Sequence, residues 1–251
     1  MHAKPSSADA LASVKDFAAH KLANASRSAE PFPWLELDKF LPVSLMNAVN
    51  QYFPGEAQMV AMPERRSVNA YARRYRRLLQ LNKASLVRLS PAARSFWETF
   101  DRLIQALVPD LMNALMPPPQ GQRYMELPVS DLGARIDLWA DRGGYQISPH
   151  TDAPHKLATF LLYCSPEASL QNEGTSIFVP KDGVMRCWAG SQWPFELFSE
   201  SHTTPYGCNR LFGFRKTDAS FHGKSSVAET VVERRTVSIT IQSNEDIAIQ
   251  A

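Results

Sequence analysis

Ser-Pro-His-Thr-Asp, residues 148–152, is the stretch that decides how the rest of the chain is interpreted. It follows a Gly-Gly pair at 143–144 and precedes an apolar run at 157–163, as expected for two short strands joined by a turn. Side chains alternate along an extended chain with a period of two residues, so His150 and Asp152 point to the same side. One imidazole nitrogen and one carboxylate oxygen can then bind a single metal ion together.

A third metal ligand is available at His222, between Phe221 and Gly223. Two histidines and one carboxylate on one face of a metal leave the opposite positions open, as in non-haem Fe(II) oxygenases. An isolated His-x-Asp is common without a metal, so the prediction depends on its combination with the following strand and the distal histidine. His155 and His202 have no partner at ligand spacing, and we interpret both as surface or loop residues.

The composition is that of a soluble globular protein. Of the 251 residues 44% are hydrophobic, and the net charge at pH 7 is only +2, which gives no electrostatic argument for nucleic acid as the main partner. No apolar run is long enough for a membrane span, and the N-terminus has no signal-peptide core. The three cysteines lack metal-site spacing and indicate reduced thiols. We therefore expect a cytoplasmic protein, while its oligomeric state is not indicated.

Residues 65–77 are strongly basic, with six arginines and two tyrosines. Such a stretch occurs in nucleic-acid and phosphate sites, but it also occurs as a solvated charged face of a helix or strand. We favour the solvated face.

Helices are predicted in the first half of the chain. We expect an N-terminal helix at 6–25, a polar linker up to residue 30, a strand at 34–37 and a helix at 42–53. The clearest amphipathic helix begins at Pro91, and Pro109 is expected to break or kink it. It should pack on the outside of a sheet.

Short strands are predicted in the second half of the chain. The strand-like runs are 133–140, 145–150, 157–164, 176–179, 210–215, 220–223 and 235–242. Helices followed by short strands predict an α+β fold with a jelly-roll core, a cupin-like double-stranded β-helix with the N-terminal helices packed on one sheet. We expect an N-terminal helix and linker over 1–30 and a single domain over 31–251.

Four ordered segments resemble the Fe(II)/2-oxoglutarate-dependent oxygenases, nearest to the prolyl-4-hydroxylase-like bacterial group: 31–42, 149–157, 172–182 and 214–223. The resemblance implies that His150, Asp152 and His222 hold Fe(II) and that 2-oxoglutarate and O2 are co-substrates. It further implies hydroxylation of an unactivated C–H bond, with succinate and CO2 released. The substrate, a small molecule or a peptidyl group, does not follow, because one fold carries many activities.

The resemblance also implies an arginine at the start of the strand after the distal histidine. Its planar guanidinium would bind the far carboxylate of 2-oxoglutarate. Arg234 and Arg235 are both candidates. Alternation gives Arg234 a polar strand face, shared with Thr236 and Ser238, and gives Arg235 an apolar one. We favour Arg234, and Arg235 stays open because jelly rolls can also have apolar inner walls.

Two aromatic residues occupy positions that the resemblance links to the co-substrate. Tyr163 matches a tyrosine that touches 2-oxoglutarate, although a tyrosine at a strand end is also explained by an ordinary hydrogen bond. Trp139 stands where many members carry a tyrosine. The connection at 185–209 is rich in aromatic residues and has the length of a lid or substrate wall, or of a loop folded over its own small core.

Two other functions are compatible with these motifs. A cupin-type metalloenzyme that does not use 2-oxoglutarate would need the metal ligands but not the strand arginine. A sensor module would bind the metal or 2-oxoglutarate without turnover, with residues 65–77 as its contact to nucleic acid or protein.

Overall fold

The computed structural model describes residues 7–61, 75–167, 170–225, 227–229 and 233–250. The helices are α1 (Ser7–Ala23), α2 (Val43–Gln51), η1 (Glu56–Gln58), α4 (Lys83–Leu86), α5 (Pro91–Ala114), η3 (Val129–Asp131), η5 (Phe195–Leu197) and α6 (Asn244–Gln250). The strands are β1 (Ser26–Ser28), β2 (Trp34–Leu37), β3 (Val60–Ala61), β4 (Arg76–Gln80), β5 (Leu132–Asp141), β6 (Ile147–His150), β7 (Lys156–Tyr163), β8 (Ser176–Pro180), β9 (Phe198–Thr203), β10 (Arg210–Arg215), β11 (His222–Lys224) and β12 (Arg234–Ser243).

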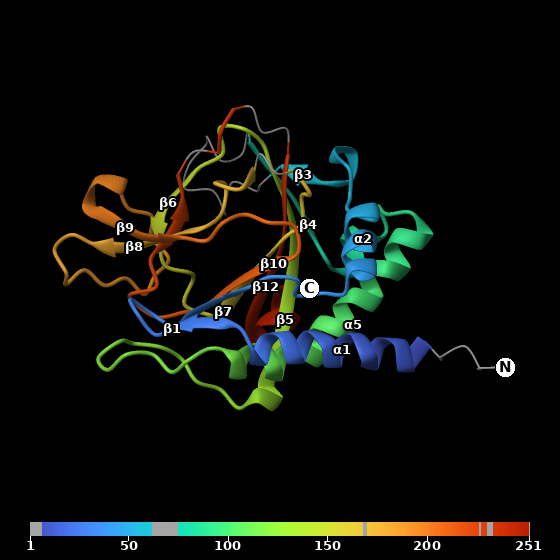
Figure 1. The fold of residues 1–251 in the computed structure, drawn as a ribbon, viewed down its shortest axis with the longest axis horizontal. Coiled ribbons are helices and arrows are strands. Elements are labelled where there is room, and N and C mark those ends of the chain that lie inside the picture. Colours follow the sequence, from blue (N-terminus) through green and yellow to red (C-terminus); the bar gives the residue numbers. More distant parts are fainter. Residues whose placement is uncertain (1–6, 62–74, 168–169, 226, 230–232, 251) are drawn as a thin grey trace.

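The strands form two antiparallel sheets. The larger sheet has eight strands in the order β1-β2-β10-β7-β12-β5-β4-β3, and the smaller has four in the order β6-β11-β8-β9. Figure 1 shows α1, α2 and α5 gathered on one side of the larger sheet, with the smaller sheet away from them. The predicted α+β class with a double-sheet core and helices on one sheet is confirmed.

Strand alternation decides which face of the larger sheet meets the helices. On β12, Val237, Ile239 and Ile241 are fully buried in the same hydrophobic cluster as the core residues of α1, α2 and α5. The intervening side chains, from Arg234 to Thr240, are also buried but lie on the opposite, inner face. The interior of the jelly roll is therefore lined by polar groups along β12.

Helix α5 begins as predicted and is continuous across Pro109. Ser90 caps it, since its Oγ accepts a hydrogen bond of 3.3 Å from the Ala93 N–H, and Pro91 is the first helical residue. Of the two alternatives predicted at Pro109, the break is wrong, because the helix runs through to Ala114, while a kink stays a prediction. Buried residues on both sides of the proline, Val108 and Leu111 among them, keep the apolar face against the sheet and offset the missing hydrogen bond.

The polar linker expected before residue 30 is also wrong. Residues 26–28 form β1, which pairs antiparallel with β2 at the edge of the larger sheet. An edge strand has solvent beside it, so a polar sequence is compatible with it and gives no apolar alternation to detect. Helix α1 packs against α5 and buries Ala18 and Leu22 in the main hydrophobic cluster.

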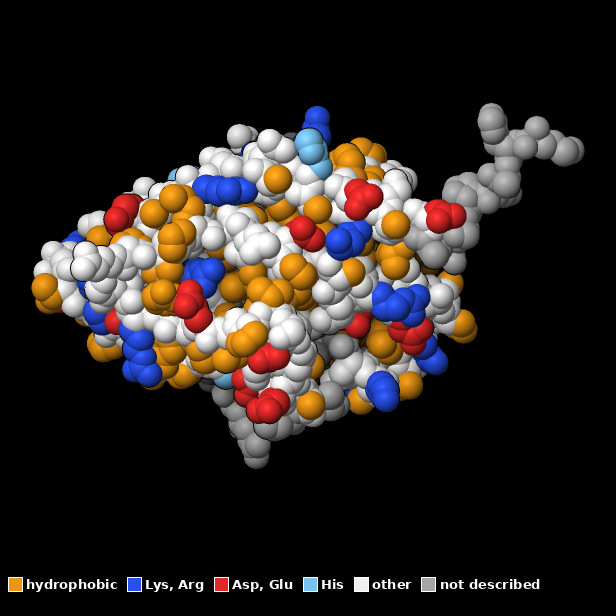
Figure 2. All heavy atoms as spheres, turned by 90° about the horizontal axis from the view of Figure 1, so that it is seen from below, with side chains coloured by type: hydrophobic (Ala, Val, Ile, Leu, Met, Phe, Trp, Pro, Cys, Tyr) orange, Lys and Arg blue, Asp and Glu red, His pale blue; other side chains and the backbone are white. Residues whose placement is uncertain are grey.

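The surface carries mixed charge where it can be seen. Lys, Arg, Asp and Glu side chains are interspersed with apolar ones on the face in Figure 2. Most of the basic stretch at 65–77 lies outside the described residues, which resume just before β4. Within the described chain, no helix is long and apolar enough to cross a membrane.

Candidate active site

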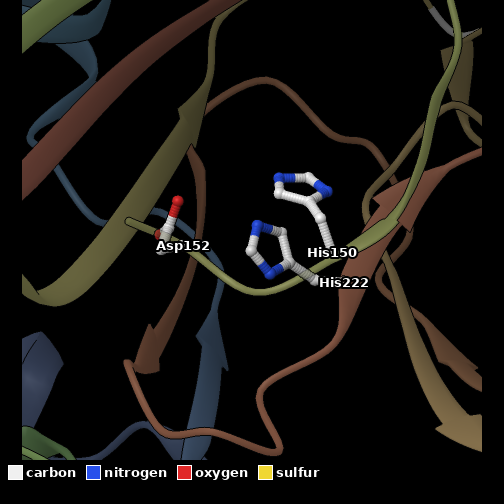
Figure 3. Close-up of side chains that lie close together, drawn as sticks. All are labelled: His150, Asp152 and His222. Carbon is white, nitrogen blue, oxygen red and sulfur yellow. The ribbon is translucent and has the colours of Figure 1, made fainter. Parts of the chain in front are cut away.

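The three predicted metal ligands lie together between the two sheets. His150 ends β6, Asp152 follows two residues later, and His222 begins β11, directly opposite His150 in the pairing of these strands. One potential ligand atom from each residue lies within 4.8 Å of the others. Figure 3 shows the two imidazole rings side by side with the carboxylate facing them. The arrangement can therefore hold one metal ion on a single face.

Backbone carbonyls orient both imidazole rings in the same way. His150 Nδ1 lies 2.9 Å from the Ser148 carbonyl oxygen, and His222 Nδ1 lies 3.0 Å from that of Ser220. A carbonyl can only accept, so each neutral ring carries its proton on Nδ1 and leaves the Nε2 lone pair free. This hydrogen bond to the second nitrogen is typical of metal-binding histidines.

The Asp152 carboxylate is held by two neighbours that sequence patterns did not indicate. Its Oδ1 accepts a hydrogen bond of 2.6 Å from Lys156 Nζ, and its Oδ2 accepts one of 2.6 Å from Thr159 Oγ1. Burial alone would raise the pKa of Asp152, but the Lys156 ammonium beside it holds it well below its ordinary value. The only sequence signal was the i, i+4 spacing of Asp152 and Lys156, which is too common to be specific.

The same burial keeps the histidines neutral. Desolvation, with His222 as the next contribution, lowers the pKa of His150 to about 3, and desolvation lowers the pKa of His222 as well. At neutral pH the cluster therefore consists of two uncharged imidazoles and one carboxylate. A divalent cation requires this protonation state of its ligands.

The two candidate arginines of β12 lie on opposite faces of the larger sheet. Arg234 is only 3% exposed, and its Nη1 donates to Asp141 Oδ2 at 2.8 Å while its Nε donates to the Glu173 carbonyl at 2.6 Å. Its Nη2 has no hydrogen-bond partner in the described part of the chain. Arg235 points outward and donates to Glu233 Oε1 at 2.6 Å. Of the two, Arg234 lies on the inner face of the larger sheet, which is turned away from the helices.

A row of side chains crosses the inner face next to Arg234. Thr236 pairs directly with Trp139 on β5 and with Tyr163 on β7. The Thr236 Oγ1 is buried and makes no hydrogen bond within the described residues. The Tyr163 hydroxyl is already bonded to Thr175 at 2.9 Å, and its ring lies 5.3 Å from the Arg234 guanidinium. Thr236 thus stands between Trp139 and Tyr163, in the row next to Arg234.

A second buried arginine near this row was not recognised from the sequence. Arg76 Nε and Nη2 donate to the two oxygens of Asp141 at 2.5 and 2.9 Å. Its guanidinium lies 4.5 Å from the centre of the Trp139 ring and 3.9 Å from that of Tyr145. Asp141 is therefore shared by two arginines. In the sequence, only the polar alternation along β5 indicates that Asp141 faces the interior.

The aromatic segment at 185–209 contains more secondary structure than expected of a lid. It contains η5 and β9, and β9 pairs with β8 in the smaller sheet. Phe195 and Phe198 pack on Phe178, which supports the alternative of a segment folded over its own small core. Trp188 differs, because Arg123 and Lys216 lie over its ring at 4.4 and 4.3 Å. A role of this segment as a lid stays a prediction.

Comparisons with known proteins give no sequence relative but several structural ones. No family model matches the chain, and neither does any curated protein. A prolyl hydroxylase from Trichoplax adhaerens, solved with a hypoxia inducible factor oxygen degradation domain peptide fragment, has a TM-score of 0.54 and 12% identity over 99% of this chain and 98% of its own.

A second solved structure similar to this chain is the non-haem alpha ketoglutarate dependent epimerase SnoN from nogalamycin biosynthesis. It has a TM-score of 0.51 and 11% identity over 94% of this chain and 84% of its own. The same epimerase has been solved with Fe3+, alpha ketoglutarate and nogalamycin RO. At such identities the likeness shows the fold alone. The chain therefore has the double-stranded β-helix fold of the 2-oxoglutarate-dependent oxygenases, with N-terminal helices covering its larger sheet.

Proposed function

We propose that this protein is an Fe(II)- and 2-oxoglutarate-dependent dioxygenase that hydroxylates an unactivated C–H bond. The observation that carries the proposal is the meeting of His150, Asp152 and His222 in the interior between the two sheets, toward which the buried Arg234 of the larger sheet also points. In the described part of the chain, neither imidazole Nε2 is taken up by a hydrogen bond within the cluster. This donor set, two imidazoles and one carboxylate, is the one that non-haem Fe(II) oxygenases use.

The residues present fit the metal and its co-substrate. When bound, Fe(II) and 2-oxoglutarate supply the reduction of O2 and the oxidation of a C–H bond, with succinate and CO2 released. The chain supplies placement. The Ser148 and Ser220 carbonyls fix both ring orientations, and Thr159 fixes the carboxylate. Arg234, whose Nη2 makes no hydrogen bond in the described part of the chain, would hold the far carboxylate beside the Thr236 hydroxyl, which also lacks a partner there.

The substrate is proposed only as a class. The Trichoplax enzyme was solved with a peptide fragment and the epimerase with nogalamycin RO, so the fold accommodates both peptidyl and small-molecule ligands. We propose one of these two classes for this protein, acting in the cytoplasm. A cupin-type enzyme without 2-oxoglutarate is less well supported, because it gives no reason for a buried guanidinium with a free N–H.

The test begins with metal binding in the absence of O2. Mn(II) and Fe(II) should bind to the wild type with one-to-one stoichiometry by calorimetry, and His150→Ala, Asp152→Ala and His222→Ala should each abolish binding while the circular dichroism spectrum is retained. His202→Ala is the matched control, since His202 stacks on Trp34 outside the cluster. Wild-type metal affinity in any of the three variants would remove that residue from the metal site.

Turnover distinguishes the enzyme from a sensor. Wild-type protein with Fe(II), 2-oxoglutarate, O2 and a pool of metabolites and peptides should form succinate and a product heavier by the mass of one oxygen atom, as detected by mass spectrometry. Binding of 2-oxoglutarate without any succinate would support the sensor alternative. Failure to bind 2-oxoglutarate in the presence of the metal would favour the cupin-type alternative.

A further inference from the structure

The buried carboxylate of Asp141, at the end of β5, pairs with two arginines. Asp141 on β5 pairs directly with Arg76 on β4 on one side and with Arg234 on β12 on the other. Both oxygens of the carboxylate bond to Arg76, and Oδ2 also accepts from Arg234. The Asp141 side chain is 0% exposed, and those of Arg76 and Arg234 are 15% and 4% exposed. The three side chains form one row across three strands.

The charges in this row do not balance. Two guanidinium groups and one carboxylate leave a net charge of +1, and within the described chain neither arginine has a second carboxylate at ion-pairing distance. Other buried acids nearby are matched one to one. Glu173 lies 3.2 Å from Lys224, and Asp137 lies 2.7 Å from Arg135. A buried net charge is costly unless an anion joins it, so the row is built to receive one.

Arg76 borders the same space as Arg234. Its guanidinium lies between the rings of Trp139 and Tyr145, and Trp139 stands opposite Thr236, whose buried hydroxyl lacks a partner in the described structure. Burial would lower the pKa of Arg76, yet Asp141 raises it above its ordinary value, so the group stays charged. Arg76 is thus a largely buried cation that shares Asp141 with Arg234, and it is not part of a solvated surface patch.

We propose that Arg76, acting through Asp141, is a specificity-determining residue that makes the pocket select 2-oxo acids carrying a second carboxylate. This proposal rests on the proposed function. Without Arg76, Asp141 would neutralise Arg234, and the pocket would offer a hydrogen-bonding fork without net charge. With Arg76, Asp141 is neutralised from β4 and the charge of Arg234 remains available to the distal carboxylate.

The test compares two ligands that differ only in the distal carboxylate. Dissociation constants for 2-oxoglutarate and for 2-oxopentanoate, which lacks that group, are measured by calorimetry without O2 on the Mn(II)-loaded protein. For Arg76→Gln we expect 2-oxoglutarate affinity to fall about ten- to fifty-fold and 2-oxopentanoate affinity to change less than about two-fold. Arg77→Gln is the matched control, because Arg77 is the next residue on β4 and pairs with the exposed Glu56.

A second variant separates charge from structural support. Arg76→Gln combined with Asp141→Asn leaves Arg234 as the only charge of the row, so the preference for 2-oxoglutarate should return to within about five-fold of the wild type. Arg76→Lys keeps the charge and should retain most of the preference. Equal losses for both ligands in Arg76→Gln, no recovery in the double variant, or a loss in Arg76→Lys as large as in Arg76→Gln would each overturn the inference.

These outcomes differ from those that would defeat the proposed function. Wild-type protein that does not bind 2-oxoglutarate with the metal contradicts the oxygenase itself. Wild-type binding with an unchanged ligand preference in Arg76→Gln contradicts only the role of Arg76. Arg76→Gln is expected to fold, because Asp141 keeps its 2.8 Å hydrogen bond from Arg234 Nη1 and is not left without a counter-charge.

Discussion

Replacing Arg234 by alanine should weaken 2-oxoglutarate binding far more than the same change at Arg235. Arg234 lies on the inner face with its Nη2 free, whereas Arg235 lies outside, bonded to Glu233 and 5.2 Å from the Phe53 ring. Adjacent residues of one strand thus provide a matched pair, because both have the same charge and the same side-chain length. The comparison isolates the face of β12 on which the guanidinium stands.

The magnitude follows from the hydrogen bonds that a guanidinium makes to a carboxylate. Each bond to a charged group is worth about 1.5–3 kcal/mol, so loss of a two-bond fork should cost about 3–6 kcal/mol, or a hundred-fold or more in affinity. The fold should survive Arg234→Ala, since Asp141 keeps both bonds to Arg76. At Arg235 the loss is a partly exposed ion pair, worth about 1 kcal/mol or less in stability.

Calorimetric titration of 2-oxoglutarate into the Mn(II)-loaded protein without O2 measures both variants directly. Arg234→Lys should recover part of the affinity, because lysine supplies the charge but not the fork. The reverse order, with Arg235→Ala the weaker binder, would show that the outer face of β12 holds the co-substrate. Equal and small effects in both variants would falsify the assignment of this strand to the co-substrate.

Three further predictions concern the surroundings of the cluster. Phe195→Ala should lower the free energy of unfolding, measured in urea, by about 1–3 kcal/mol without changing 2-oxoglutarate affinity. Trp188→Ala should alter the KM for substrate and have a smaller effect on stability. The opposite pattern would make the Phe195 region the substrate wall. The metal-free protein should lose thermal stability as the pH falls below about 6.5. The reason is that His150 and His222 have folded-state pKa values below the ordinary 6.5, so the unfolded chain binds protons at these residues first. His222→Gln should make the melting temperature depend less on pH, and an unchanged dependence would contradict this reasoning. Lys156→Met should tighten Mn(II) binding about ten-fold by removing a cation from Asp152 Oδ1, whereas weaker binding would mean that Lys156 holds the carboxylate in place.

The three residues of the candidate metal site were predictable as a group from the sequence, because their positions follow local rules. His150 and Asp152 are two residues apart on an extended segment, and a period of two places them on one side before any tertiary structure is known. His222 lies on another strand, so it reaches the other two residues only if that strand pairs with β6. The pairing of β11 with β6 meets this condition. The same alternation separated Arg234 from Arg235 correctly by face. These inferences required only which residues form strands and which face of the strand each side chain occupies. Patterns of apolar residues in the sequence indicate both.

The features that were missed depend on pairing between distant strands. The strands β1, β3, β4 and β9 were not predicted, and they are short or polar, with β1 and β3 at the edges of the larger sheet and β9 at the edge of the smaller one. The sequence of the basic stretch does not indicate that Arg76 points into the interior. Neighbouring arginines differ only in the face of the strand on which they lie, and this face is not evident from a run of arginines. Asp141 looked like an ordinary acid at a strand end. Its importance follows only from the identity of its two cross-strand neighbours.

The register of β5 is what joins the two halves of the candidate site. Arg76 and Arg234 stand opposite Asp141, and Thr236 stands opposite Trp139, so the charged row and the row beside it are fixed by the same two ladders. A slip of one residue in either ladder would turn the arginine of that strand from the interior toward the helices, where the face of β5 is apolar. Burial of Ile136, Leu138 and Ala140 against the helical layer opposes such a slip. The helices that cover the larger sheet therefore act on the interior chemistry, because the apolar face that they bury keeps the charged face aligned.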